Sequence, residues 1–247
     1  MNEKIYISKT DYLNMSEEPD IMNHLPVYRI EKIKRLKNER ARNESMAAGL
    51  LLVKALSSYT GKTETEMLEY LNAKEHDADK RCLKINAGDI YYSITHSGGY
   101  VAVAVAKCPV GVDVEVKDDK DFKVTRRMMA EEDKEYILHP MLSEEKRQIH
   151  FRDIWTIKES FLKCTGEGIS VPLNSFSVKL QGALMVYGGR MVNSSGVLWK
   201  IVSLGYPLGD KNYYVGTTRL ENEKYSLSIC SSNSNLTLDI QMVEVLS

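Results

Sequence analysis

The chain has 247 residues, of which 43% are hydrophobic and 27% charged, and its formal net charge at pH 7 is −1. This length allows a sizeable core in one large domain or two small ones, and the composition is that of an ordinary soluble globular protein. The nearly neutral charge argues against a general attraction for nucleic acid and leaves only a local basic patch open.

Cysteine spacing and apolar runs exclude further classes. Cys82, Cys108, Cys164 and Cys230 form no CxxC pair and have no histidine beside them at ligand spacing. We therefore expect neither a zinc site nor a disulfide framework, and reduced thiols in a cytoplasm fit better. Residues 1–10 lack the apolar segment of a signal peptide, and no apolar run is long enough to span a bilayer. The sequence thus predicts a cytoplasmic protein that does not bind membranes.

Residues 4–71 predict a strand followed by helices. Lys4–Ser8 alternates apolar and polar residues as a strand does. Residues 28–57 keep helical spacing and predict one long helix or two abutting ones, which Gly61 ends. Thr63, with a glutamate three residues later, predicts a short helix over 63–71. The long helical segment begins with many cations, which form either a solvated face or a landing surface for phosphates or an acidic partner. These cations are Arg29, Lys32, Lys34, Arg35, Lys37, Arg40 and Arg42.

Strand patterns dominate the middle of the chain. Residues 72–86 are polar and are expected to be mostly loop. Residues 91–106 predict a hairpin, YYSIT and YVAVAVA, whose turn is the HSGG stretch from His96 to Gly99. Residues 109–116, PVGVDVEV, predict a further strand.

The second half continues with two predicted helices, over 121–138 and 143–165, and Gly166 and Gly168 end the second of them. From Ser170 onward the sequence predicts strands in the segments FSVKL, ALMVYG, VLWKIVSLG, YYVGTTR, YSLSICS and LTLDIQMVEV. A weak internal echo links the halves, because a helix ending in Thr-Gly and a strand of the type YVAVAVA or YSLSICS occur in each.

Asp113 and Glu115 stand two residues apart on the strand 109–116 and therefore share one face of it. The strand could simply turn this polar face to water. Alternatively the two carboxylates share a Mg²⁺ ion, which prefers carboxylate oxygens and usually binds substrate phosphates as well. Valines on the opposite face would hold the acids in a fixed orientation.

The helix 143–165 carries Lys158, Glu159 and Lys163. Glu159 and Lys163 have the spacing of an ordinary helix ion pair; alternatively, Glu159 is a third metal ligand or general base and the lysines face phosphates. His96 in its glycine turn is either structural or a phosphate ligand, and a return strand could bring it to the same end of the sheet as Asp113. No GxGxxG, P-loop or GxSxG pattern is present.

Three stretches together resemble one family, the larger type of 4′-phosphopantetheinyl transferase. They are SITHSGGYVAVAVA, VGVDVE and WTIKESFLKCTGEGISVPLNSFSV, in this order. Weaker similarity extends from DKRCL, at about residue 79, to the C-terminal strands.

The resemblance implies an α+β fold of two similar halves related by a pseudo-twofold axis, with coenzyme A in the cleft between them. We expect an N-terminal half over 1–108, a C-terminal half over 109–204, and a tail over 205–247 that completes the sheets. It also implies a reaction in which a serine of an apo carrier protein attacks the β-phosphate of coenzyme A, takes the phosphopantetheine arm and releases adenosine 3′,5′-bisphosphate.

The resemblance further implies residue roles. Asp113, Glu115 and Glu159 would bind Mg²⁺, Glu159 would accept the serine proton, and Lys163 would stabilise the leaving phosphate. Coenzyme A contacts would come from Lys80, Thr95, His96, Lys158 and Lys163. The sequence departs from the family at Ser93, where an asparagine is usual, at Arg81, where a proline is usual, and at Glu44, near which the family has an arginine that Arg40 or Arg42 would replace.

Two functions follow as expectations. The first is the transferase, a monomer acting on carrier proteins of peptide, polyketide or fatty-acid synthesis. The second is a non-catalytic module that keeps the coenzyme A cleft but has lost turnover, and its support is the departures at Ser93 and Glu44.

Overall fold

The computed structural model describes residues 3–10, 19–73, 82–85, 88–116, 128–168, 171–184, 198–204, 213–233, 236 and 239–245. The chain divides into two compact units, one formed by 1–108 with 237–247 and the other by 109–236. Each described unit combines helices with a five-stranded sheet, which confirms the α+β class. The twofold relation between the halves stays a prediction.

The sheet of the first unit has the order β10-β1-β4-β3-β2. Its strands are β1 (Lys4–Lys9), β2 (Cys82–Ile85), β3 (Gly88–Ser97), β4 (Tyr100–Ala106) and β10 (Asp239–Met242). β1 pairs with β10 in parallel, and the other pairs are antiparallel. β2 lies within the stretch expected to be mostly loop, so that expectation is wrong over residues 82–85.

Helices of the first unit are α1 (Val27–Arg35), α2 (Glu39–Thr60) and α3 (Glu64–Asn72), preceded by a 3₁₀ turn at Pro19–His24. The 28–57 segment is therefore two abutting helices. The second begins at Asn38, whose side chain accepts a hydrogen bond from the Ala41 amide, and ends at Gly61 in the left-handed conformation. Thr63 and Glu66 form the predicted capping box.

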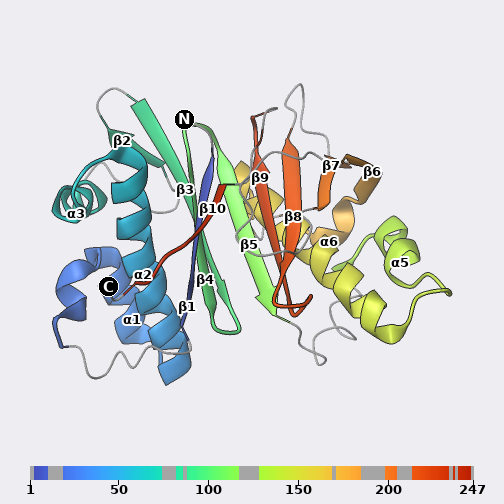
Figure 1. The fold of residues 1–247 in the computed structure, drawn as a ribbon, viewed down its shortest axis with the longest axis horizontal. Helices are drawn as coiled ribbons and strands as arrows, with labels where there is room; N and C mark the ends of the chain where they lie inside the picture. The colour runs from blue at the N-terminus through green and yellow to red at the C-terminus, as the bar shows by residue number, and fades with distance from the viewer. Residues whose placement is uncertain are drawn as a thin grey trace. The chain divides into compact units, whose positions relative to one another are not determined.

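The core of this unit lies between α2 and the sheet (Figure 1). Leu51 and Leu52 of α2 are completely buried with Val103 of β4, and each leucine contributes about 1.5–3 kcal/mol by leaving water. The predicted hairpin is confirmed, with Gly98 and Gly99 at φ 58° and 97° in its turn. His96 lies on β3 rather than in the turn.

The sheet of the second unit is antiparallel, with the order β5-β9-β8-β7-β6. Its strands are β5 (Val110–Val116), β6 (Val178–Leu184), β7 (Leu198–Leu204), β8 (Tyr214–Leu220) and β9 (Tyr225–Ser231). FSVKL and the start of ALMVYG form the single strand β6, which has a register shift between Gln181 and Ala183; residues 185–188 lie outside the described part of the chain.

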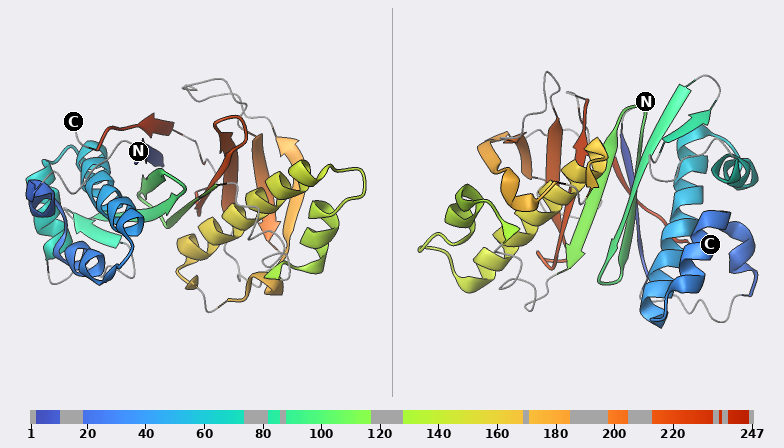
Figure 2. Two further views of the ribbon diagram at one scale, coloured as in Figure 1. Left: turned by 90° about the horizontal axis from the view of Figure 1, so that it is seen from below. Right: turned by 180° about the vertical axis from the view of Figure 1, so that it is seen from behind.

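Helix α6 (Glu144–Thr165) packs across one face of this sheet (Figure 2). It begins after Ser143, whose hydroxyl accepts a hydrogen bond from the Lys146 amide, and ends at Gly166 in the left-handed conformation. Like α2 it has 22 residues, which extends the internal echo seen in the sequence. Of the predicted helix 121–138, the described part contains α5 (Glu131–Ile137); residues 121–127 lie outside it. A short 3₁₀ turn, Leu173–Ser175, precedes β6. None of the described helices is long and apolar enough to cross a membrane.

Candidate active site

Gly111 brings strand β5 into backbone contact with helix α6. A Cβ atom at Gly111 would overlap the carbonyl oxygen of Ser160 and lie 2.5 Å from the amide nitrogen of Cys164. Only glycine permits such an approach within a strand. Since side chains two apart share a strand face, Asp113 and Glu115 lie on the same α6-facing side of β5 as this contact. The opposite face is apolar, and Val110, Val112 and Val114 are buried there.

Asp113, Glu159 and Lys163 come together on this side. The Lys163 ammonium lies 2.6 Å from Asp113 Oδ1 and also donates to the Val112 carbonyl oxygen at 3.2 Å. Asp113 is buried and Glu159 half-buried. The pKa of Glu159 is raised, first by burial and then by the nearby negative charge of Asp113, while Lys163 opposes the rise. Lys163 lies one turn after Glu159 on α6. Its ammonium reaches across the contact between α6 and β5 and forms an ion pair with Asp113.

The carboxylates suit a divalent cation that is shared with a phosphate. Within the described ranges, no three His, Cys, Asp or Glu residues form a group able to hold a metal ion on their own. Mg²⁺, however, is commonly held by one or two carboxylates together with substrate phosphates and water. Asp113 and Glu159 repel each other, which a cation between them would relieve. Glu115, half-buried, lies on the same face. The donor set therefore fits Mg²⁺.

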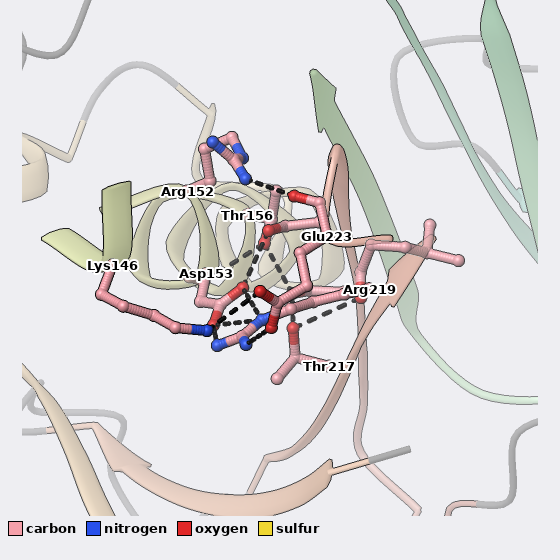
Figure 3. A network of polar contacts seen from close by, with 10 residues as sticks. Lys146, Arg152, Asp153, Thr156, Thr217, Arg219 and Glu223 are labelled. Carbon is pink, nitrogen blue, oxygen red and sulfur yellow. Dashed lines mark hydrogen bonds and ion pairs between the residues drawn. The ribbon is translucent and has the colours of Figure 1, made fainter. Parts of the chain in front are cut away.

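A polar network fixes the first half of α6 on the sheet (Figure 3). Arg219 of β8 contacts the Asp153 carboxylate through Nη2 at 2.6 Å and Glu223 Oε1 through Nη1 at 2.5 Å. Arg152 donates to the Glu223 carbonyl oxygen at 2.6 Å, and Lys146 lies 3.0 Å from the Glu223 carboxylate. These contacts tie three residues of α6 to β8 and to the turn before β9.

Buried hydroxyls extend this network toward the acids. Thr156 of α6 and Ser228 of β9 share a hydrogen bond of 2.7 Å, and Ser228 donates to Thr217 at 2.9 Å. Ser228 is the register partner of Asp113 in the β5–β9 pair. The helix is thus held on the sheet on both sides of Glu159, by Thr156 before it and by the Gly111 contact after it. Rigid support of this kind fixes catalytic groups more precisely than a loop does.

Lys158, which the resemblance assigns to coenzyme A binding, points into the interior of the second unit. Its side chain is fully buried, and its ammonium donates to the carbonyl oxygens of Leu173 at 2.7 Å and Phe176 at 2.6 Å and pairs with Asp133 of α5. Burial lowers the pKa of Lys158, and the hydrogen bond to Asp133 opposes this. Since the side chain exposes no surface to a ligand, we leave Lys158 out of the proposed site.

The remaining candidates belong to the first unit. His96 Nδ1 lies 3.2 Å from Glu44 Oε2, and Arg40 Nε lies 3.1 Å from Glu44 Oε1, so Arg40 and His96 are brought together through the residue that departs from the family. Thr95 is buried and, as the neighbour of His96 on β3, points to the opposite face. Arg42 is exposed on α2. Lys80 lies outside the described residues.

One step of the sequence reasoning is wrong. From the sequence alone, a return strand could bring His96 to the same end of one sheet as Asp113. β3 and β5 instead belong to different sheets in different units, because the chain leaves the first sheet after β4.

Sequence reasoning also misses several residues that support the candidate groups. Asp133 and Asp153 are ordinary helix acids by pattern, and Glu44 stood out only as a departure from the family. Each has a partner from a distant segment: Lys158, Arg219 and His96, respectively. Gly111 carried a usable signal, since an isolated glycine inside a β-branched strand often marks a close approach of another backbone.

Comparison with known proteins agrees with this geometry. Residues 109–218, which contain β5 and α6, match the family model of the 4′-phosphopantetheinyl transferase superfamily. The chain is 23% identical over 231 residues to 4′-phosphopantetheinyl transferase Sfp of Bacillus subtilis (strain 168), covering 94% of this chain and 92% of that protein. It is 24% identical over 241 residues to 4′-phosphopantetheinyl transferase ffp of Bacillus subtilis, covering 97% of each.

Another relative is more similar, but over a shorter part of the chain. Over 100 residues the chain is 35% identical to 4′-phosphopantetheinyl transferase gsp of Aneurinibacillus migulanus, and the match spans 41% of that protein's length. Residues 109–218 thus match the 4′-phosphopantetheinyl transferase superfamily, and nearly the whole chain is similar to proteins that carry that name.

Proposed function

We propose that the protein transfers the 4′-phosphopantetheine arm of coenzyme A to a serine of an apo carrier protein, with Mg²⁺ bound by Asp113, Glu115 and Glu159. The observation that carries the proposal is the meeting of Asp113, Glu159 and Lys163 at the contact of β5 with α6. Acids and a lysine at one point are suited to phosphoryl-type transfer, in which the protein mainly positions groups and neutralises charge.

In this reaction the serine oxygen bonds to the β-phosphorus of coenzyme A, and the bond from that phosphorus to the oxygen of the leaving adenosine 3′,5′-bisphosphate breaks. Glu159, directly or through water, takes the serine proton. Lys163, held at Asp113, stabilises negative charge on the leaving phosphate. Bound Mg²⁺ would neutralise the pyrophosphate oxygens.

His96 and Arg40 are proposed to contact coenzyme A phosphates, together with Lys80, Arg42 and Thr95. The partners are carrier proteins or domains of peptide, polyketide or fatty-acid synthesis, including secondary metabolism. We further propose that the enzyme acts as a monomer in the cytoplasm, where the free thiols of its four cysteines would stay reduced.

The proposal is tested by incubating the protein with coenzyme A, Mg²⁺ and a panel of apo carrier proteins and measuring carrier mass. We expect the mass increase of one phosphopantetheinyl group in place of the serine hydroxyl hydrogen. Glu159→Gln should lower kcat by about 10²–10⁴-fold, whereas Glu145→Gln, an exposed position on the same helix, should leave it unchanged. Unchanged carrier mass across the panel would refute the activity. Coenzyme A binding without any transfer would instead favour the non-catalytic module.

A further inference from the structure

Arg40, Glu44 and His96 form a connected cluster on the first unit. Arg40 and Glu44 lie one turn apart near the start of α2, and His96 lies on β3 next to its turn. One oxygen of the Glu44 carboxylate contacts His96 Nδ1 at 3.2 Å, and the other accepts a hydrogen bond from Arg40 Nε at 3.1 Å. The carboxylate therefore bridges two potential cations.

Glu44 is the best buried of the three. Its side chain is 12% exposed, against 35% for His96 and 69% for Arg40. The pKa of Glu44 is lowered, mainly by the hydrogen bond with His96 and further by Arg40, although burial opposes the change. At neutral pH a carboxylate thus lies between an exposed arginine and a half-exposed histidine, and it neutralises part of the charge of the arginine.

The contact with Glu44 determines how His96 can meet a ligand. Because a carboxylate only accepts hydrogen bonds, Nδ1 carries the ring proton, and Nε2 is the nitrogen left for an anion. A phosphate at Nε2 would require a second ring proton, and Glu44 would then balance the positive ring. In such an arrangement a carboxylate accepts a hydrogen bond from one ring nitrogen of a histidine and thereby orients the other ring nitrogen toward the ligand.

We propose that Glu44 is a positioning residue for His96: it holds Nδ1 so that Nε2 binds a phosphate group of coenzyme A, with Arg40 as the second cation. The identity of the ligand rests on the proposed function. The alternative is that the Glu44 carboxylate occupies the place of the phosphate and weakens its binding. The two possibilities predict opposite changes in coenzyme A affinity. Removal of Glu44 weakens binding if Glu44 positions His96, and strengthens binding if Glu44 occupies the place of the phosphate.

The test measures coenzyme A affinity by calorimetry. Glu44→Ala should raise Kd by about tenfold or more, as loss of such a supporting carboxylate does. Glu44→Gln keeps an oxygen that accepts from Nδ1 and should raise Kd by less than about threefold. Glu39→Ala, an exposed glutamate on the first turn of the same helix, should change nothing. Glu44→Ala combined with His96→Ala should bind no more weakly than His96→Ala alone, because Glu44 acts through His96.

A ligand-free measurement separates this proposal from the proposed function. Side-chain ¹⁵N spectra should show His96 protonated on Nδ1 in the wild type and a mixture of tautomers in Glu44→Ala, and inorganic phosphate should shift the His96 signals in the wild type only. Tighter coenzyme A binding by Glu44→Ala, or no effect of phosphate on His96, would overturn the proposal. Carrier modification that fails while coenzyme A binding follows the expected pattern would refute the transferase and leave the role of Glu44 intact.

Discussion

Replacing Lys158 by methionine should destabilise the protein because Asp133 would keep a buried charge without its partner. Both side chains are 0% exposed, and removing one member of a buried ion pair typically costs about 3–5 kcal/mol. Asp133 also accepts a hydrogen bond from the Val178 amide at 2.8 Å, so Asp133→Asn can keep that contact. We therefore expect Lys158→Met alone to lose about 3–5 kcal/mol of unfolding free energy.

The double variant Lys158→Met/Asp133→Asn removes both charges. It still leaves the Leu173 and Phe176 carbonyl oxygens without the ammonium, which costs about 1–3 kcal/mol, so it should be more stable than Lys158→Met alone. Urea unfolding, followed by circular dichroism, measures the unfolding free energy of Lys158→Met, of Asp133→Asn and of the double variant. Lys134→Met, in a more exposed ion pair on α5, is the control and should lose less than about 1 kcal/mol.

The reasoning would be refuted if the two single substitutions were additive, or if Lys158→Met lost less than 1 kcal/mol and instead weakened coenzyme A binding. The latter result would return Lys158 to the phosphate-binding role that the family resemblance implies.

Three further predictions concern other parts of the fold. Gly111→Ala should lose at least about 1–3 kcal/mol, because the new methyl group meets backbone atoms; Gly88→Ala, with its nearest neighbour at 3.6 Å, should lose much less in the same denaturation assay. Glu159→Gln should stabilise the metal-free protein at neutral pH, because a carboxyl with a raised folded-state pKa costs stability once it ionises. That gain should grow as the pH rises above the ordinary carboxyl value and vanish below about pH 4; a constant gain across denaturation curves at several pH values would contradict it. Glu221→Asn should raise the melting temperature slightly, because φ is 47° there and asparagine tolerates this conformation better; an unchanged or lower melting temperature would contradict the assignment of backbone strain.

Local signals predicted much of the fold. The hairpin of β3 and β4 was predictable because paired glycines provide the positive φ of its turn, and the ends of α2 and α6 were predictable because Gly61 and Gly166 adopt the left-handed conformation. The boundary between α1 and α2 could also have been found, since Asn38 is a strong helix cap. β2 was missed because its four residues lie in a polar stretch.

The candidate site was predictable only in part. Spacing along β5 placed Asp113 and Glu115 on one face. The helix pattern left Glu159 and Lys163 either as an ordinary ion pair or as site residues, and the family resemblance favoured the second interpretation. The direction of Lys158 was not predictable, because adjacent helical positions point about 100° apart and its partner, Asp133, comes from another helix. The same limit applies to Glu44, whose contact with His96 depends on how α2 packs on the sheet.

The parallel pairing of β1 with β10 has a consequence for biosynthesis. Residues 4–7 pair with residues 239–242, whereas the second unit, 109–236, is continuous in sequence and lies between them. A ribosome needs on the order of 10 s to synthesise such an intervening segment. During that time β10 has not been synthesised, so the edge of β1 that pairs with it stays unpaired, while the second unit can already fold. The nascent chain therefore carries an open sheet edge at its beginning, where premature pairing with another chain is the main hazard.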